Sequence, residues 1–155
     1  MVKITKEIEF DYGHRIPNHD SLCFSPHGHR GRVVVCVEGN INTRKGSADE
    51  GMVVDFKDLK IILKECVHDH FDHSFLVYEH DLFYECLLKF INNCNTEEYE
   101  RLRIRKLDYI PTAENIAKDI YERINNKIHE VFTSRVTLCW VKFYETPTSS
   151  ATYSE

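Results

Sequence analysis

The first dozen residues alternate so strictly between apolar and polar side chains that they favour a single local structure. Across residues 2–12 one parity carries Val2, Ile4, Ile8, Phe10 and Tyr12, and the other carries Lys3, Thr5, Glu7, Glu9 and Asp11. A period of two predicts a β-strand with one buried face. His14 has the parity of the apolar face, so the chain must either turn this imidazole inward at the strand end or bulge at Gly13.

A second strand is predicted to start at His27 and to end at Gly39-Asn40. Its centre, residues 33–37, is a β-branched apolar run of the kind that is buried on both faces. Residues 15–26 are rich in Pro, Asn, Asp and Ser and are expected to form the connecting loop. We expect the two strands to pair antiparallel, which would bring His14 near His27 and His29.

These three histidines form a candidate metal site. In an extended segment His27 and His29 point to the same side and can share one ion. Three imidazoles around a tetrahedral metal would leave one position open for water or substrate, as in catalytic zinc sites. The chain has nine histidines, however, and a His-X-His pair can also be merely solvated.

Amphipathic segments with helical spacing follow the second strand. Asp55 is a good N-cap, and the apolar residues after it have the helical period: Phe56, Leu59, Ile62, Leu63, Cys66 and Val67. This helix ends in the His- and Asp-rich run 68–73, which is either a solvated terminus or a second metal site. Residues 81–93 form another amphipathic candidate, and Thr112 is expected to cap a last helix that extends to Val131.

The order of these elements predicts the fold class. A final strand, residues 136–144, delivers Glu145 and Thr146 at its end. Neither an internal repeat nor a second domain is visible in the sequence. Residues 1–155 are therefore expected to form one α+β domain with helices on one face of an antiparallel sheet.

Composition narrows the function classes. The formal net charge is −5 and there is no long basic run, so nothing favours binding to nucleic acid. No apolar stretch approaches the length of a membrane span, and the N-terminus alternates with charges where a signal peptide would be apolar. We expect a cytoplasmic protein whose six cysteines are thiols instead of disulfides. Most lie in apolar patterns, but Cys23 lies in a loop among histidines.

Several motifs, in the correct order, resemble one known family. His14, Cys23 and the segment His27-Gly28-His29 are similar to the zinc and thiol motif of the 6-pyruvoyltetrahydropterin and 6-carboxytetrahydropterin synthase family. Further similar segments are Met52 to Lys60, Asp72-His73 with Leu76, Pro111 to Asn115, and Glu145-Thr146. The resemblance implies the tunnelling fold, in which helices pack on one face of an antiparallel sheet.

The resemblance also implies roles for particular residues. It assigns zinc binding to His14, His27 and His29 and catalysis to Cys23, Asp72 and His73. It assigns substrate binding to Glu145, Thr146 and Thr112, with the Glu145 carboxylate on the pterin ring. Val77 departs from the pattern, because the family usually has Asn there.

Assembly is likewise implied by the resemblance alone. Members form homohexamers, dimers of trimers whose sheets join into barrels, with active sites at subunit junctions. Compact members have a short connection where this chain has residues 78–107, so a helical insertion is expected there. The basic end of the insertion, residues 101–106, is either a solvated face or a contact for an anionic substrate tail.

The implied substrate is 7,8-dihydroneopterin triphosphate. In the carboxy-forming enzymes, which serve queuosine-type synthesis, the thiol lies four residues before the first histidine of the pair, as Cys23 does before His27. That spacing favours conversion to 6-carboxy-5,6,7,8-tetrahydropterin, acetaldehyde and triphosphate. The alternatives are a 6-pyruvoyltetrahydropterin synthase, which eliminates triphosphate from the same substrate, and a non-catalytic zinc- or pterin-binding protein on the same fold.

Overall fold

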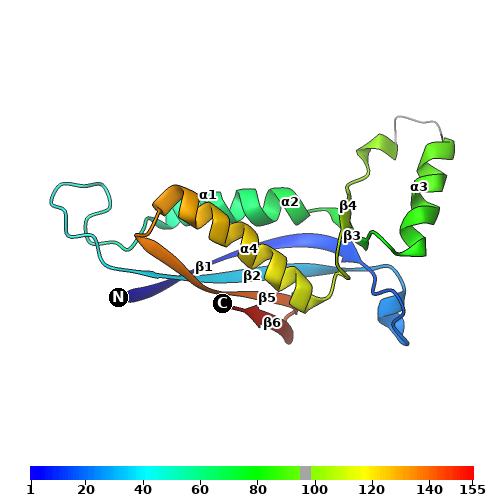
Figure 1. Ribbon diagram of the computed structural model, residues 1–155, viewed down its shortest axis with the longest axis horizontal. Helices are drawn as coiled ribbons and strands as arrows, with labels where there is room; N and C mark the ends of the chain where they lie inside the picture. Colours follow the sequence, from blue (N-terminus) through cyan, green and yellow to red (C-terminus); the bar gives the residue numbers. More distant parts are fainter. Residues whose placement is uncertain (95–98) are drawn as a thin grey trace.

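A computed structural model describes residues 1–94 and 99–155, in which one twisted sheet carries helices on one face (Figure 1). The six strands lie in the order β4-β3-β1-β2-β5-β6. Their bounds are β1 (Val2–His14), β2 (His27–Gly39), β3 (Ser74–Tyr78), β4 (Ile104–Leu107), β5 (Val136–Thr146) and β6 (Ser149–Tyr153). The fold class predicted from the sequence, α+β with helices on one face, is confirmed.

Strands β1 and β2 form an unbroken antiparallel ladder. It runs from the pair Val2 and Gly39 to the pair His14 and His27 without a shift of register. Gly13 is therefore not a bulge, and His14 keeps the parity of the buried face; its side chain is only 1% exposed. The predicted antiparallel pairing of these strands is confirmed.

The sheet is mixed, however, and not purely antiparallel. Strand β3 runs parallel to β1, and β4 runs parallel to β3. Both strands are short, with five and four residues, and β4 lies in the charged end of the predicted insertion. Strand β6 is also short and carries Ser and Thr where a buried strand would be apolar. Patterns this brief do not show a period, so the sequence analysis missed all three strands.

The helical elements follow the predicted amphipathic segments. They are α1 (Phe56–Leu63), a π-helical turn η2 (Lys64–His68), α2 (Asp69–Phe71), α3 (Leu82–Cys94) and α4 (Ala113–Phe132), with 3₁₀ turns η1 (Leu22–Phe24) and η3 (Tyr99–Arg101). Both predicted N-caps are confirmed: the N–H of Lys57 donates to Asp55 at 2.8 Å, and that of Asn115 to Thr112 at 3.4 Å. No helix in the described part of the chain is both long and apolar enough to cross a membrane.

The core lies between the sheet and the helices α1, α2 and α4 (Figure 1). Phe71 of α2, Ile120 of α4 and Phe143 of β5 are fully buried in it. The opposite face of the sheet carries the charged residues of β1 and is not covered by these helices. The side chains of the site therefore project from β1 and β2 into the helix-covered layer.

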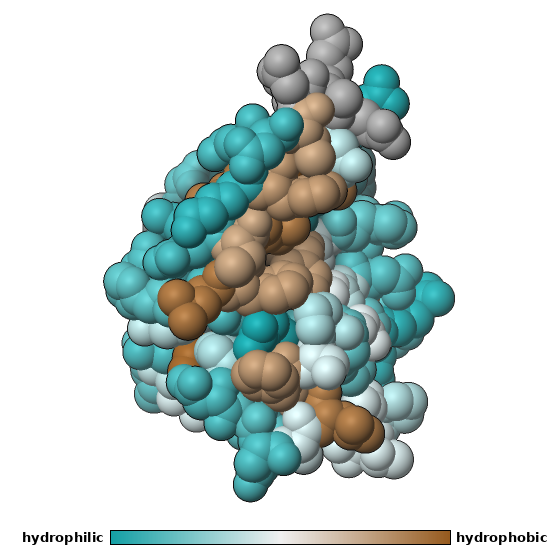
Figure 2. All heavy atoms as spheres, turned by 90° about the vertical axis from the view of Figure 1, so that its right-hand side faces the viewer, coloured by the Kyte–Doolittle hydropathy of each residue, from teal (hydrophilic) through white to brown (hydrophobic). Residues whose placement is uncertain are grey.

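Helix α3 stands beside one end of the sheet (Figure 1). None of its residues is fully buried within this chain, and Leu82 and Phe90 are 73% and 52% exposed. Figure 2 shows hydrophobic side chains gathered in a band on the face where α3 lies. The helix predicted over residues 81–93 is thus present, but no other element of the described chain fully covers its apolar side chains. Residues 95–98 of the predicted insertion lie outside the described residues.

Candidate metal centre

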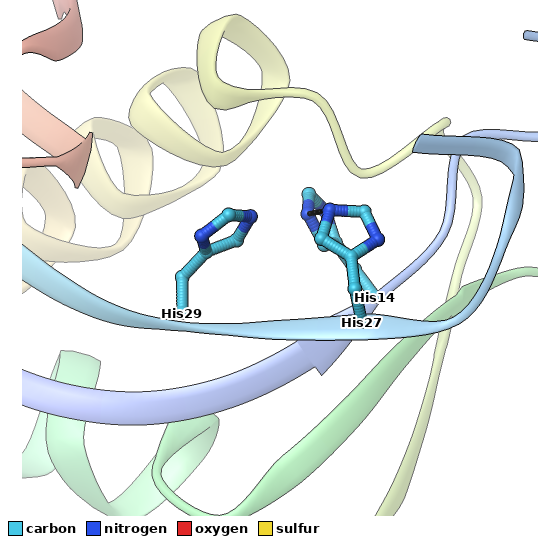
Figure 3. Close-up of side chains that lie close together, drawn as sticks. All are labelled: His14, His27 and His29. Atoms are coloured by element: carbon cyan, nitrogen blue, oxygen red, sulfur yellow. Dashed lines mark hydrogen bonds between the residues drawn. The ribbon is translucent and has the colours of Figure 1, made fainter. Parts of the chain in front are cut away.

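Three imidazoles converge at the end of the β1–β2 ladder. His14 is the last residue of β1, while His27 and His29 come from the start of β2, all on one face (Figure 3). One ring nitrogen of each lies within 4.8 Å of those of the other two. The pairing predicted from parity therefore brings the three histidines together, as expected.

The hydrogen bonds of the rings leave nitrogen lone pairs directed at one another. His14 donates from Nδ1 to the carbonyl oxygen of Pro111 at 2.7 Å, and His27 donates from Nδ1 to that of Ser25 at 2.8 Å. A carbonyl oxygen can only accept, so both Nδ1 atoms carry protons. Burial lowers the pKa of His14 to about 4, so its Nε2 presents a lone pair at neutral pH. That atom faces Nε2 of His27 at 3.1 Å.

This arrangement fits a metal ion. A cation bound between Nε2 of His14 and Nε2 of His27 would stabilise the two lone pairs that face each other. The carbonyl oxygens of Pro111 and Ser25 fix the orientations of these rings, as hydrogen-bond partners of metal-binding histidines usually do. The Nε2 of His29 is buried and has no hydrogen-bond partner within the described part of the chain, so a cation bound here would also satisfy this nitrogen. Three nitrogen ligands suit zinc and similar divalent ions.

Glu145 and Tyr12 line the same centre. Oε1 of Glu145, near the end of β5, lies 3.6 Å from Nε2 of His14. The centre of the Tyr12 ring lies 5.2 Å from that of His14 and 5.8 Å from that of His29. Its hydroxyl is buried and has no hydrogen-bond partner in residues 1–94 and 99–155. Burial, and secondly Glu145, raise the pKa of Tyr12. The sequence analysis placed Tyr12 on the buried face but missed its place at the site, although it shares the parity of His14.

Cys23 lies in η1, within the segment that joins β1 to β2. Its carbonyl oxygen accepts a hydrogen bond from the N–H of Ile16 at 2.8 Å, and its side chain is partly exposed. Among the described residues, no hydrogen bond or ion pair joins its thiol to Asp72 or His73. All six cysteines are free thiols, as expected.

Asp72 and His73 form a dyad that is fixed to β1. His73 donates from Nδ1 to Asp72 at 2.7 Å, while the N–H of Asp11 donates to the other carboxylate oxygen at 3.0 Å. The N–H of His73 donates in turn to the carbonyl oxygen of Asp11 at 2.7 Å. Burial opposes ionisation of Asp72, but the bonds from Asp11 and His73 outweigh it and lower its pKa. The carboxylate therefore orients an imidazole that is 73% exposed.

The two candidate threonines have structural partners. Thr112 caps α4, and its neighbour Pro111 supplies the carbonyl oxygen that holds His14. Thr146 accepts from the N–H of Ser149 at 3.1 Å and so stabilises the turn into β6. A role for either threonine in substrate binding stays a prediction.

The histidine-rich helix end has a structural explanation. Arg103 and Arg105 donate to the carbonyl oxygens of Asp69 and His70 at 2.9 and 2.8 Å, which satisfies the carboxyl end of the helical stretch. Burial, followed by the charges of Arg123 and Arg105, lowers the pKa of His70 to about 4. These cations disfavour a second metal there. In the described ranges, His14, His27 and His29 are the one cluster with metal-ligand spacing.

Val77, the departure from the family pattern, is fully buried in β3. An apolar side chain suits that position, because an amide there would need a buried hydrogen-bond partner.

Comparisons with known proteins agree on one family. The family model described as 6-pyruvoyl tetrahydropterin synthase matches residues 3–155. The 6-carboxy-5,6,7,8-tetrahydropterin synthase of Haemophilus influenzae is 30% identical over 155 residues, which span all of both chains. The protein of the same name from Rickettsia conorii is 34% identical over 147 residues, 95% of this chain and 96% of the relative.

Solved structures share the fold. An uncharacterized protein from Wolinella succinogenes matches with a TM-score of 0.78 and 24% identity, covering 99% of this chain and 98% of that one. The 6-pyruvoyltetrahydropterin synthase of Plasmodium vivax matches with a TM-score of 0.70 and 19% identity, covering 99% and 97%.

The imidazole cluster predicts that the purified protein carries about one divalent metal ion per chain. His27→Ala should lose most of that metal, because it removes one of three nitrogen ligands, whereas His129→Ala, on the exposed side of α4, should keep it. Elemental analysis after dialysis measures the difference. Equal metal content in the two variants would disprove the site.

His70 predicts part of the acid sensitivity of the fold. Its pKa is about 4 in the folded chain against about 6.5 when unfolded, so between these values the unfolded chain binds more protons. Its contribution to the free energy of unfolding is therefore lost as pH falls from about 6.5 to about 4. His70→Asn should flatten this decline in urea titrations, and the exposed control His129→Asn should not. Identical slopes in both variants would contradict the prediction.

Proposed function

Since the chain belongs to the 6-pyruvoyl tetrahydropterin synthase family, and is therefore an enzyme of the lyase type, we propose that it is a zinc-dependent 6-carboxy-5,6,7,8-tetrahydropterin synthase. Its substrate would be 7,8-dihydroneopterin triphosphate, and its products 6-carboxy-5,6,7,8-tetrahydropterin, acetaldehyde and triphosphate. The pathway would be that of queuosine and related deazapurines.

One observation carries this proposal: ring nitrogens of three imidazoles meet beside a carboxylate. The carboxy product is supported by the names of the relatives and by the spacing of four residues from Cys23 to His27. A bound zinc ion would supply positive charge beside the substrate side chain and favour loss of a proton from the adjacent carbon.

Different residues of the chain would bind the pterin and transfer the proton. Glu145 would accept two parallel hydrogen bonds from the 2-amino group and the adjacent ring N–H of the pterin. Cys23, as thiolate, would remove or relay the substrate proton. Asp72 orients His73, whose exposed Nε2 would exchange protons with the thiol or the substrate.

A relay of this kind would be completed by a second chain. Within one chain no hydrogen bond or ion pair links Cys23 to the described dyad, and the exposed imidazole of His73 is free to face a neighbour. This supports the homohexamer, a dimer of trimers with sites at subunit junctions, as part of the proposal. The cytoplasmic location belongs to the same proposal.

Two other functions are alternatives to the proposed one, and product analysis distinguishes them. A 6-pyruvoyltetrahydropterin synthase would use the same residues and is favoured by the description of the matching family. A non-catalytic zinc- or pterin-binding protein would not need Cys23, Asp72, His73 and Glu145 together, so their joint presence argues against it.

Product analysis tests the proposal directly. Zinc-loaded protein incubated with 7,8-dihydroneopterin triphosphate should yield 6-carboxytetrahydropterin and acetaldehyde, identified by mass spectrometry. Pyruvoyltetrahydropterin as the main product would select the first alternative. Tight binding of the pterin without any product would select the second.

The thiol can be separated from the metal. Cys23→Ala should keep zinc and pterin binding but lose at least about a hundred-fold in kcat, the usual contribution of a general acid–base group. His73→Ala should resemble it, and the double variant should be little worse than either, because groups in one relay are not additive. Cys86→Ala, an exposed thiol on α3, is the matched control. Fully additive losses, or metal loss in Cys23→Ala, would contradict the relay.

A further inference from the structure

A buried ion pair lies between the thiol-bearing segment and helix α3. Arg15 follows the metal-site residue His14 directly, and its side chain is only 9% exposed. Its Nε lies 3.3 Å from Oδ2 of Asp81, whose side chain is 5% exposed. The angle of the contact does not meet that of a hydrogen bond, and neither atom has a hydrogen-bond partner among the residues that the structure describes. Two opposite charges thus hold each other away from water, where separating them is unfavourable.

The same guanidinium lies over two aromatic rings. Its central carbon lies 4.3 Å from the ring centre of Phe24 and 5.2 Å from that of Phe83. Phe24 is the residue after Cys23, and Phe83 lies in the first turn of α3. Planar stacking of a cation on aromatic faces adds to the charge contact. Arg15 therefore joins the segment that carries the thiol to the helix of the insertion.

Among the hydrogen bonds and ion pairs of the described residues, two join residues 15–26 to the rest of the chain: the bond from Nδ1 of His27 to the carbonyl oxygen of Ser25, and the pair of Arg15 with Asp81. The backbone hydrogen bonds of residues 15–26 outside regular elements run within the segment, such as that from Ile16 to Cys23. Phe83, by contrast, also packs against Phe75 of β3, with ring centres 5.9 Å apart. The side from α3 is thus anchored on the sheet. The thiol segment is held at Ser25 by His27 of β2, and Arg15 is its link to α3.

We propose that Arg15, Phe24, Asp81 and Phe83 form a brace that holds the Cys23 segment in its working position. Arg15 and Asp81 are then positioning residues, which act through Cys23 and do not touch the substrate. The inference rests on the proposed role of Cys23. It gives the predicted insertion, residues 78–107, a contribution, because Asp81 and Phe83 lie in it at the start of α3. Helix α3, which carries Phe83, lies at the end of the molecule that is labelled in Figure 1 and faces the viewer in Figure 2.

Asp81→Asn tests the brace with little damage to α3. Asp81 also accepts a hydrogen bond from the N–H of Phe83 at 2.9 Å, and an Asn side chain can keep this cap while it removes the charge that faces Arg15. Glu85→Gln is the matched control, because it removes a charge from the exposed side of the same helix. Both variants should have the circular dichroism of the parent.

The first readout needs no substrate. Iodoacetamide alkylates Cys23, and peptide mass spectrometry resolves the rate at this thiol from the rates at the other cysteines. The rate is measured at increasing pH until it reaches the plateau at which the thiol is fully ionised. A segment that opens more often should raise this plateau by at least about fivefold in Asp81→Asn and in Phe83→Leu. Arg15→Lys should also raise it, because an ammonium keeps the charge but not the planar stack. The plateau in Glu85→Gln should stay at that of the parent.

The second readout links the brace to turnover. In Asp81→Asn the kcat should fall at least about tenfold, since a displaced acid–base group loses its alignment, while KM and zinc content stay near those of the parent. A parent without synthase activity would refute the proposed function, yet alkylation would still decide whether the brace exists.

Three results would overturn the proposal. The first is an alkylation plateau that is the same in Asp81→Asn, Phe83→Leu and the parent. The second is loss of zinc in Asp81→Asn, which would mean that the pair supports His14 instead of the thiol. The third is a raised plateau with unchanged kcat in an active enzyme, which would show that the position of the segment does not matter for the reaction.

Discussion

The register of the β1–β2 ladder is the constraint on which the rest of this structure depends. Because side chains alternate along a strand, a slip of one residue would move the whole apolar set of β1 to the uncovered face. The same slip would carry His14 away from its partner His27. Core packing and the assembly of the candidate metal site are therefore one requirement, and the apolar residues that fix the register also bring the three histidines together.

The strands of that ladder place the three imidazoles, and backbone groups from other segments orient them. The strands bring the imidazoles together, while the backbone carbonyls of Pro111 and Ser25 fix which nitrogen of His14 and His27 faces inward. Pro111 precedes the capped start of α4, so the packing of that helix on the sheet also sets the orientation of His14. The cost of burying neutral imidazoles is offset by hydrogen bonds that leave one nitrogen free for a cation.

Parity and capping were sufficient to predict much of this from the sequence. The alternation in β1, the caps Asp55 and Thr112, and the convergence of three histidines follow from local patterns. Local patterns do not identify partners that are distant along the chain. Three contacts of this kind could not be predicted: the parallel pairing of β3 and β4, the hydrogen bond from Asp11 to Asp72, and the pair of Arg15 with Asp81. In each, the residues next to one partner in the sequence do not indicate the other.

Strand β1 also fixes the distance between Asp11 and His14. Asp11 holds the Asp72–His73 dyad through its backbone, and the candidate ligand His14 follows three residues later on the same strand, a separation of about 10 Å in extended chain. Changes in the flanking loops leave this spacing intact, because it is set by covalent geometry and not by packing. An insertion or deletion between the two residues would instead shift the Asp72–His73 dyad relative to the histidine cluster, so this interval should tolerate substitution far better than any change of length.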